Sequence, residues 1–351
     1  MFHPLRVSEV ERLTDDAVAV TFAVPPELHE AFRHTPGQHV TLRRTVRGGE
    51  IRRTYSICAP AAPHGADPVV RVGIRLVDGG EFSTYALKEL AVGDLVDVME
   101  PLGRFTLAPR AGRFAAVVGG SGITPVLSIA ATLLASEPGA RFCLIRSDRT
   151  AASTMFLDEV ADLKDRYPDR FQLVTVLSRE EQQAGLPSGR LDQPRLRALL
   201  PALLPVEAVD GWFLCGPLGL VRGAEQALRG LGVERARIHQ EVFHVDEGTA
   251  PVAVPAAAPA GSTLTATLDG RSGTWAVQEG ESLLETVLRA RADAPYACKG
   301  GVCGTCRSFL VSGEVRMERN YALEPEETDA GYVLACQSHP LSPEVELDFD
   351  R

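Results

Sequence analysis

Four of the seven cysteines are spaced so that they could share one inorganic core. Cys298, Cys303 and Cys306 follow the pattern C-x4-C-x2-C in a glycine-rich stretch, and Cys336 comes much further along the chain. Four thiolates suit iron, and this is the ligand spacing of plant-type [2Fe–2S] clusters. Because such a cluster handles one electron at a time, the spacing predicts a role in electron transfer.

Two other uses of these cysteines are open. A structural zinc site normally pairs two short Cys-x2-Cys units, and this stretch holds only one. Disulfides would leave one of the seven cysteines over, and the N-terminal residues lack the long apolar core of a secretory signal. The iron–sulfur interpretation is therefore favoured over both. Cys58 and Cys143 lie in apolar runs and are expected to be buried.

Length and composition are those of a multidomain globular protein. The 351 residues, 45% of them hydrophobic and 23% charged, suggest two or three domains with their own cores. No apolar stretch reaches the about eighteen residues of a membrane-spanning helix, so no membrane partner is expected. The formal net charge of −10 argues against nucleic acid as a partner. A cytoplasmic location is predicted, because thiols stay reduced there.

The negative charge is concentrated near the C-terminus. Residues 263–351 contain 15 Asp and Glu against 8 Lys and Arg, a balance of −7 that leaves −3 for the first 262 residues. This can be an ordinary solvated surface. It can also be an acidic docking face around the cysteines that steers a basic protein partner.

The first segment, residues 1–109, is predicted to be a β-domain. Short runs rich in Val, Ile and Thr are punctuated by Gly and Pro, and a brief helix is expected over 83–90. The expected strands are 17–24, 39–43, 51–57, 69–77 and 95–99. Several short strands separated by turns favour a closed antiparallel β-barrel.

From residue 110 to 245, strands and helices alternate. Expected strands at 114–118, 142–145, 171–177 and 212–215 are interleaved with helices at 125–135, 155–164 and 218–230. This pattern predicts a parallel α/β sheet with helices on both faces. A Pro- and Ala-rich linker follows at 246–262. Residues 263–351 then suggest a small mixed sheet with one helix, which a capping box from Ser282 to Glu285 would start.

Two short motifs in the first segment could bind a phosphorylated cofactor. Arg53-Thr-Tyr-Ser56 lies on an expected strand, where side chains alternate between two faces. Gly79-Gly-Glu-Phe-Ser83 opens the expected helix, and N–H groups at a glycine turn and helix N-terminus suit a diphosphate. Either motif alone could be ordinary barrel structure, so the prediction of a phosphorylated cofactor rests on finding both.

A further glycine-rich turn starts the α/β segment. Gly119-Gly-Ser-Gly-Ile-Thr124-Pro125 follows a strand that ends in Val-Val. Thr124 is a suitable N-cap, and Pro125 is a suitable first helical residue. Unpaired N–H groups and the helix dipole favour anions there. A dinucleotide-phosphate site is therefore preferred over a plain strand–helix turn.

Together these motifs resemble the ferredoxin–NADP reductase superfamily, in which a flavin-binding β-barrel precedes a nicotinamide-binding α/β domain. The resemblance implies that Arg53 binds a flavin phosphate, Tyr55 stacks on the isoalloxazine and Ser56 hydrogen-bonds near flavin N5. It implies that a turn containing Gly80, Phe82 and Ser83 holds the flavin diphosphate. Contacts to the nicotinamide dinucleotide are implied for Gly120, Gly122 and Thr124.

The same resemblance assigns roles near the end of the α/β segment. Cys215, which Gly216 and Pro217 follow, would lie beside the nicotinamide ring where hydride leaves. Glu241 would hydrogen-bond close to the reacting atoms, so that Ser56, Cys215 and Glu241 are the expected catalytic residues. Phe243 would cover the flavin face and yield to nicotinamide, although on its own it could equally be a core aromatic.

The choice between NADPH and NADH rests on two strand ends. Ser147-Asp-Arg149 ends the second strand of the α/β segment, and Ser178-Arg-Glu180 ends the third. Arginines can grip a 2′-phosphate, whereas a lone acid prefers a free ribose hydroxyl. The second triplet resembles the NADPH-binding version of the superfamily, so NADPH is favoured, with Arg149, Ser178 and Arg179 as ligands. Asp148 departs from a purely basic pocket.

The domain order narrows the resemblance, because a C-terminal ferredoxin domain of β-grasp-like fold follows the two reductase domains. Residues 296–306, 320–326, 330–337 and 348–350 resemble the reductase components of ring-1,2-phenylacetyl-CoA epoxidases, which are bacterial multicomponent oxygenases. This implies FAD, a [2Fe–2S] cluster on the four cysteines, NADPH as the electron donor and a separate di-iron oxygenase as the protein acceptor.

Three alternatives stand beside that resemblance. A reductase of the same build could serve a Rieske, steroid or other di-iron oxygenase. A phthalate-dioxygenase-type reductase would use FMN and NADH, against which Ser178 and Arg179 argue. An electron carrier or redox sensor without turnover of its own is disfavoured, because the nicotinamide half is complete.

Overall fold

The structure is a computed structural model that describes residues 1–46, 49–180, 188–244 and 261–351. Its contacts divide the chain into two compact units, Met1–Val245 and Asp246–Arg351, and each is described by itself. The predicted linker at 246–262 lies, apart from its last two residues, outside the described residues. Within the described ranges, no helix is long and apolar enough to span a membrane.

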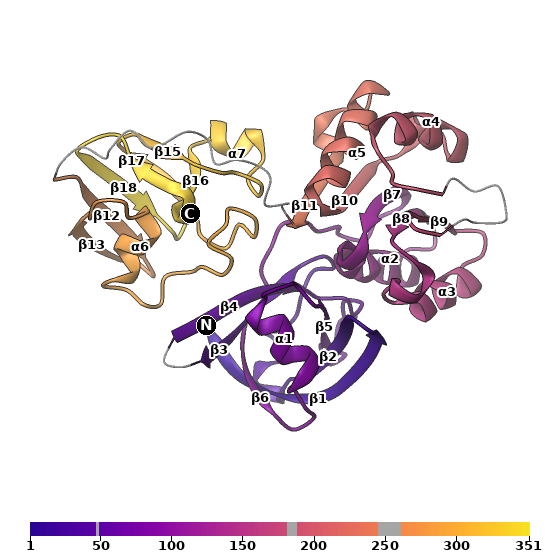
Figure 1. The fold of residues 1–351 in the computed structure, drawn as a ribbon, viewed down its shortest axis with the longest axis horizontal. Coiled ribbons are helices and arrows are strands. Elements are labelled where there is room, and N and C mark those ends of the chain that lie inside the picture. The colour runs from indigo at the N-terminus through magenta and orange to yellow at the C-terminus, as the bar shows by residue number, and fades with distance from the viewer. Residues whose placement is uncertain (47–48, 181–187, 245–260) are drawn as a thin grey trace. The chain divides into compact units, whose positions relative to one another are not determined.

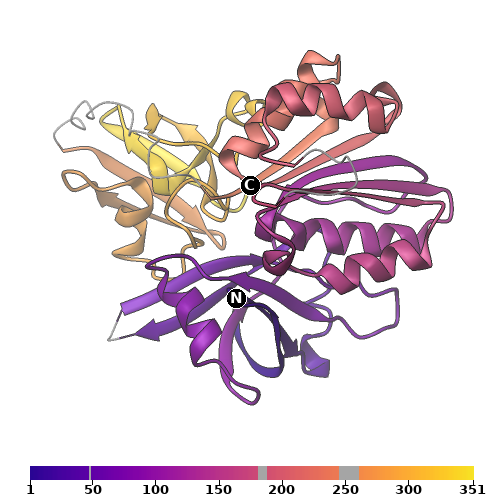
Figure 2. The same ribbon diagram turned by 45° about the vertical axis from the view of Figure 1, so that its right-hand side comes forward.

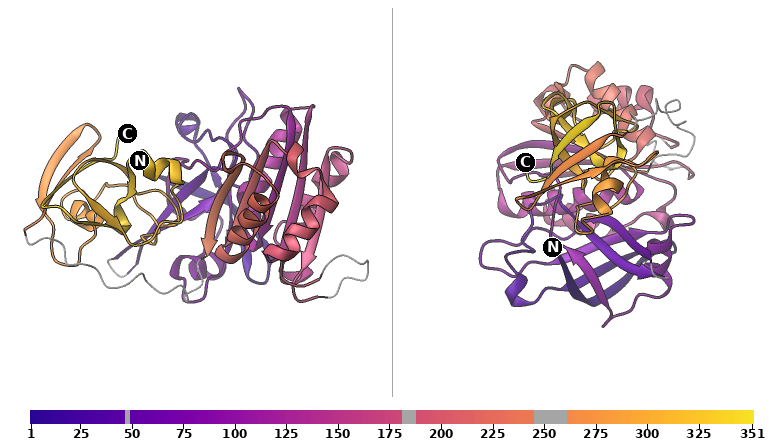
Figure 3. Two further views of the ribbon diagram at one scale, coloured as in Figure 1. Left: turned by 90° about the horizontal axis from the view of Figure 1, so that it is seen from above. Right: turned by 90° about the vertical axis from the view of Figure 1, so that its left-hand side faces the viewer.

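The first unit begins with a six-stranded sheet in which every pairing is antiparallel, in the order β4-β3-β6-β1-β2-β5. The elements are β1 (Phe2–Thr14), β2 (Ala17–Ala23), β3 (His39–Val46), β4 (Gly49–Ser56), β5 (Val70–Arg75), α1 (Glu81–Lys88) and β6 (Leu95–Met99). A bridge between Ile57 and Val72 connects the two outer strands. The strands curve around one core, as the right-hand view of Figure 3 shows in indigo and purple.

Alternating inward side chains build the barrel core, as the period of two in a β-strand requires. Val40, Leu42, Val72 and Ile74 are fully buried there. The predicted antiparallel barrel is confirmed. Strand β1 was missing from the prediction, because only three of its thirteen residues are buried and its sequence has no apolar period.

A five-stranded parallel sheet completes the first unit, in the order β11-β10-β7-β8-β9. Its elements are β7 (Gly112–Gly119), α2 (Ile123–Ser136), β8 (Ala140–Asp148), α3 (Leu157–Arg166), β9 (Phe171–Leu177), α4 (Gln193–Leu203), β10 (Gly211–Pro217), α5 (Leu218–Gly230) and β11 (Ile238–His244). Helices α2 and α3 lie on one face and α4 and α5 on the other (Figures 1 and 2). The strand order reverses around β7, and the carboxyl ends at such a point are where α/β sheets bind ligands.

The barrel and the α/β domain are joined by specific contacts. Arg71 on β5 pairs with Glu159 on α3 at 3.1 Å. Ser128 on α2 donates a hydrogen bond of 2.6 Å to the carbonyl of Ala59. A side chain at Gly73 would place its Cβ 2.8 Å from Thr124 Cγ2 and 2.9 Å from the Phe156 ring. This glycine therefore lets β5 approach the start of α2 closely.

The second unit is a small mixed sheet in the order β13-β12-β18-β14-β16, with β12 and β18 parallel and the other pairs antiparallel. Its elements are β12 (Thr263–Leu268), β13 (Arg271–Ala276), α6 (Leu283–Leu288), β14 (Arg307–Ser312), β15 (Val315–Met317), α7 (Pro325–Asp329), β16 (Tyr332–Leu334), β17 (Ser338–Pro340) and β18 (Glu344–Asp348). The capping box at α6 is confirmed, since Ser282 Oγ accepts from Glu285 N at 3.3 Å. The short helix α7 adds to the single helix that the sequence predicted.

Candidate functional site

The flavin motif lies on β4, opposite β3. Arg53 is exposed, and its guanidinium donates to the carbonyl of Arg52 at 2.7 Å. Tyr55 is half-buried, and burial raises the pKa of its hydroxyl. Its ring lies 5.7 Å from the ring of Phe82. The strand thus presents one exposed cation and one aromatic ring on the same face, as the alternation predicted.

The Gly79–Ser83 turn opens α1, as the sequence predicted. Gly80 is the N-cap, and Glu81 is the first helical residue. Ser83 Oγ donates to the carbonyl of Gly80 and accepts from Val77 N, both at 3.1 Å, so this hydroxyl is used to shape the turn. Phe82 is 2% exposed and packs in the barrel core. Only its backbone is therefore placed to meet a ligand at the turn.

The three expected catalytic residues come together although they belong to different strands. Ser56 ends β4, Cys215 lies on β10 and Glu241 lies on the neighbouring β11. Ser56 hydrogen-bonds to the Glu241 carboxyl. Cys215 Sγ lies 4.0 Å from Glu241 Oε2. This convergence joins the end of β4 in the barrel to the carboxyl edge of the parallel sheet.

A fourth side chain, His39, was not identified from the sequence. It begins β3 directly opposite Ser56 in the strand pairing, and its Nδ1 lies 3.9 Å from Glu241 Oε1. Gly103 makes room for the imidazole, because a Cβ there would lie 2.9 Å from His39 Nδ1. Nothing marks His39 in the sequence except its place after Pro36-Gly-Gln38.

Burial makes these groups neutral near pH 7. It raises the pKa of Glu241 to about 8, against the hydrogen bond from Ser56, which favours the carboxylate. It lowers the pKa of His39 to about 4. Burial and then the Glu241 carboxylate raise the pKa of Cys215 well above its usual value. The cluster can therefore hold a proton at Glu241 without carrying a net charge.

The glycine-rich turn of the α/β domain packs directly against the segment that carries Cys215. A Cβ at Gly122 would lie 2.3 Å from the carbonyl oxygen of Cys215, and one at Gly216 would lie 2.8 Å from the carbonyl of Gly119. Gly120 adopts φ +56°, which favours glycine. Only glycines permit this backbone-to-backbone approach. Pro217 is exposed, and Phe243 is half-buried against the core of the domain.

One expectation about this turn is wrong. Thr124 is not the N-cap of α2, because the helix begins at Ile123 and Gly122 takes the capping position. A short 3-10 turn over Gly120–Gly122 precedes the helix, which therefore begins two residues earlier than expected. Thr124 is 1% exposed, and its hydroxyl donates to the carbonyl of Ser121 at 2.9 Å. Its hydroxyl therefore stabilises the turn.

The strand ends that were expected to read the ribose lie side by side. Backbone hydrogen bonds link Ser178 N to the Asp148 carbonyl at 2.8 Å and Arg179 N to the Arg149 carbonyl at 2.9 Å. Both arginine side chains are exposed. The Asp148 carboxylate is not part of this exposed surface. It is 1% exposed and pairs with Arg146 Nε at 2.8 Å.

In the second unit, three cysteines lie in the loop between α6 and β14, and Cys336 lies on a turn after β16. Ala335 N donates to the carbonyl of Cys306 at 3.0 Å, which brings the fourth cysteine to the loop. Gly301 and Gly304 adopt φ +76° and +71°. A Cβ at Gly301 would also lie 2.9 Å from the carbonyl of Arg319. Gly301 and Gly304 therefore let this loop curl through backbone angles that other residues resist.

The donor set of this loop fits a two-iron cluster. The thiols form two hydrogen-bonded pairs, Cys298 with Cys303 and Cys306 with Cys336. The hydrogen bond from Cys303, followed by N–H groups of the loop such as Gly300 N at 3.3 Å, lowers the pKa of Cys298 to about 5. In the described ranges no three His, Cys, Asp or Glu side chains are grouped as a site for a single ion. Amide N–H groups aimed at sulfur are the contacts that stabilise thiolate ligands.

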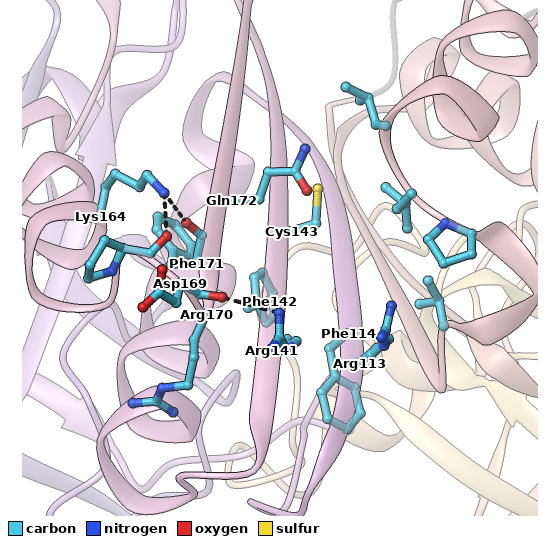
Figure 4. A pocket seen from close by; sticks show the side chains of 15 residues that line it. Arg113, Phe114, Arg141, Phe142, Cys143, Lys164, Asp169, Arg170, Phe171 and Gln172 are labelled. Carbon is cyan, nitrogen blue, oxygen red and sulfur yellow. Dashed lines mark hydrogen bonds between the residues drawn. The ribbon is translucent and has the colours of Figure 1, made fainter.

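A cavity of about 400 Å³ lies at the other end of the parallel sheet (Figure 4). It is lined by the amino ends of β7, β8 and β9. Three of its cations are engaged by backbone carbonyls: Lys164 donates to those of Pro168 and Phe171 at 2.7 and 2.9 Å, Arg141 to that of Asp169 at 3.3 Å and Arg170 to that of Leu134 at 2.8 Å. The residues argued above for a nucleotide lie at the opposite, carboxyl edge.

Comparison with protein families matches three successive parts of the chain to three family models. Residues 4–107 match the oxidoreductase FAD-binding domain, 117–226 the oxidoreductase NAD-binding domain and 266–341 the 2Fe-2S iron-sulfur cluster binding domain. A fold with these three domains and the convergent Ser56, Cys215 and Glu241 defines an NAD(P)H oxidoreductase with flavin and iron–sulfur domains.

Individual relatives define the family more closely. The chain is 44% identical over 353 residues to a subunit of the 1,2-phenylacetyl-CoA epoxidase of Escherichia coli, covering 99% of this chain and 98% of that protein. It is 33% identical to the ferredoxin reductase component of the 3-ketosteroid-9-alpha-monooxygenase of Rhodococcus rhodochrous, covering 98% and 96%. The chain belongs to this family of oxygenase reductase components. Phthalate dioxygenase reductase shares the fold, with a TM-score of 0.59 at 24% identity over 99% of this chain and 98% of that one.

Proposed function

We propose that this protein takes electrons from NADPH and delivers them to the oxygenase component of a phenylacetyl-CoA epoxidase, with FAD and a [2Fe–2S] cluster as its cofactors. The observation that carries the proposal is the 44% identity to the Escherichia coli epoxidase protein over nearly both whole chains. A flavin exchanges a hydride with nicotinamide and single electrons with an iron–sulfur cluster, and the protein supplies binding, orientation and electrostatics.

The described residues fit a flavin at the barrel edge. The exposed guanidinium of Arg53 is available for a phosphate, and Tyr55 offers a ring on the same face of β4. The N-terminus of α1 adds the N–H groups that follow Gly80, which suit an anion, whereas Gly80 N itself donates to the carbonyl of Val77 at 2.8 Å. Ser56 and Glu241 would meet the reacting end of the ring system. Glu241 would there accept or release a proton, because its pKa of about 8 lies close to neutral pH.

The carboxyl edge of the parallel sheet fits a nicotinamide dinucleotide. The turn at Gly120 and Gly122 and the start of α2 would hold its diphosphate. Arg149 and Arg179 are exposed cations at adjacent strand ends, and Ser178 directly precedes Arg179. Two arginines on these adjacent strand ends favour a 2′-phosphate, which supports NADPH over NADH.

The acidic C-terminal unit is the proposed docking surface for the oxygenase. The segment that follows β15 packs on the cysteine loop, with Tyr321 N donating to the carbonyl of Gly301 at 3.0 Å. Glu318 and Glu326 are exposed on that segment and the helix after it. A basic partner would be steered toward the loop by these charges. Raising ionic strength should therefore slow electron delivery to the oxygenase while leaving reduction of a small neutral acceptor unchanged.

The coenzyme assignment is tested by Arg179→Gln, with Arg166→Gln on exposed helix surface as the matched control. The first variant should raise KM for NADPH at least tenfold and change KM for NADH less than twofold, because only NADPH carries the 2′-phosphate. The control should behave as wild type with both coenzymes. Equal effects of Arg179→Gln on both would refute the assignment.

The acceptor is tested by reconstitution in aerated buffer. Purified protein, NADPH, phenylacetyl-CoA, O2 and the phenylacetyl-CoA epoxidase oxygenase should give the epoxide and water, with one NADPH oxidised for each epoxide formed. The oxygenase component of a 3-ketosteroid-9-alpha-monooxygenase serves as the control partner, since a related reductase serves it. Faster electron delivery to the steroid oxygenase would indicate that the protein serves an oxygenase of that kind instead.

A further inference from the structure

A buried ion pair lies at the carboxyl end of β8. Arg146 Nε donates to Asp148 Oδ2 at 2.8 Å, and both side chains are 1% exposed. Arg146 Nη2 donates to the carbonyl of Met155 at 2.9 Å. Arg146 Nη1 and Asp148 Oδ1 have no hydrogen-bond partner among the described residues. Each charge therefore depends on the other, and neither is neutralised by solvent.

The Arg146–Asp148 pair adjoins the exposed Arg149 and Arg179 along the two strand ends. Asp148 precedes Arg149 in the chain, and its carbonyl accepts from Ser178 N, one residue before Arg179. An acid at such a strand end normally accepts a hydrogen bond from the ribose 2′-hydroxyl and disfavours a 2′-phosphate. Here the carboxylate faces inward, because Arg146 lies two residues earlier on the same face of the strand.

We propose that Arg146 is a specificity-determining residue, an internal counter-ion that neutralises Asp148 so that the Arg149–Arg179 surface accepts a 2′-phosphorylated nucleotide. The inference rests on the proposed use of NADPH and assigns part of that preference to a residue that does not touch the nucleotide. A carboxylate about 10 Å from a phosphate, at an effective dielectric of about 20, changes binding on the order of tenfold. Arg146 removes this penalty.

A purely structural role makes a different prediction. Arg146 also holds the carbonyl of Met155, so it could act only by fixing the loop between β8 and α3. In that case its loss would weaken every adenine nucleotide alike, whether or not the ribose carries a phosphate. Discrimination between two nucleotides that differ only in that phosphate separates the two roles.

The experiment uses the full, cofactor-loaded protein and three variants: Arg146→Met, Asp148→Asn and the double variant. Calorimetry at pH 8 and low salt measures binding of 2′-phosphoadenosine 5′-phosphate and of AMP, and melting curves establish that each variant is folded. Arg146→Met should weaken binding of the bisphosphate about tenfold and binding of AMP less than twofold. The double variant should return bisphosphate affinity to within about threefold of wild type, because the uncompensated carboxylate is gone.

Equal loss of both nucleotides in Arg146→Met, or no recovery in the double variant, would overturn the proposal. If Arg146→Met does not fold, Asp148→Asn tests the proposal instead. This variant leaves the Arg146 charge uncompensated, so it should bind the bisphosphate more tightly and AMP as wild type does. No change in that variant would also overturn it. Wild-type protein that binds AMP as tightly as the bisphosphate would instead refute the NADPH preference itself.

Discussion

Replacing Glu241 by Gln should change how the stability of the first unit depends on pH. Burial raises the pKa of this carboxyl from 4.5 to about 8 in the folded protein. Between pH 4.5 and about pH 8, the folded state therefore keeps a proton on Glu241 that the unfolded chain has lost. Stability that the protonated carboxyl contributes is fully present below pH 4.5, declines as pH rises and is lost above pH 8.

The size of the effect follows from the shift. A difference of 3.5 pKa units corresponds to about 5 kcal/mol, with 1.36 kcal/mol for each unit. The side chain retains 17% exposure, so water reduces this cost and about 2–4 kcal/mol is expected at pH 9. Gln cannot ionise and escapes the cost. For a unit of this size, Glu241→Gln should melt roughly 5–15 °C above wild type at pH 9 and no more than a few degrees from it at pH 5.

The assay follows release of the fluorescent flavin during heating, which reports on the first unit, at pH values from 5 to 9. Exposed Glu27 provides the control, and Glu27→Gln should follow the wild-type curve throughout. A difference between Glu241→Gln and wild type that stays constant with pH would refute the reasoning. It would mean that the carboxyl does not titrate in this range in the folded protein.

Three further predictions concern other parts of the molecule. Cys303→Ala should leave NADPH-driven ferricyanide reduction within about twofold of wild type and lower electron delivery to an oxygenase at least 100-fold. Loss of both activities in folded, flavin-loaded protein would contradict the proposal that electrons leave through the cluster. Gly122→Ala should lower kcat/KM for NADPH on the order of 100-fold, since its Cβ would lie 2.3 Å from the Cys215 carbonyl; wild-type kinetics would show that the turn can shift. Gly73→Ala should destabilise the first unit by about 1–3 kcal/mol in denaturant melts, because its Cβ would press on Thr124 and Phe156; an unchanged midpoint would mean that the two domains move apart without cost.

Local patterns in the sequence were sufficient for most of the architecture. The α5 helix was predicted with its observed ends, and the apolar strands of the parallel sheet were found because both of their faces are buried. The cysteine spacing and the Ser282 capping box were also recognisable, because each is defined within a few residues. Helix α4 was missed, since Pro194 and Pro201 interrupt its pattern, although Asp192 caps it.

The parts that escaped prediction depend on contacts between distant segments. His39 joins Glu241 only because the barrel and the parallel sheet meet, and the two residues are about 200 positions apart. Asp148 was interpreted as part of an exposed pocket, whereas Arg146 draws it inward. Neither pairing has a spacing or composition that a single sequence displays.

The position of Cys336 has a consequence for how the protein is made. Three of the four thiols lie in one loop, but the fourth is placed by the pairing of β16 with β14, and the segment with β15 and α7 separates them. During translation the ribosome therefore releases three of the four proposed cluster ligands before Cys336. With the four thiols as ligands of the proposed cluster, its assembly would require the pairing of β16 with β14 and would therefore follow synthesis of nearly the whole polypeptide. A chain that ends before Cys336 would lack one of the four proposed ligands and would not assemble the cluster.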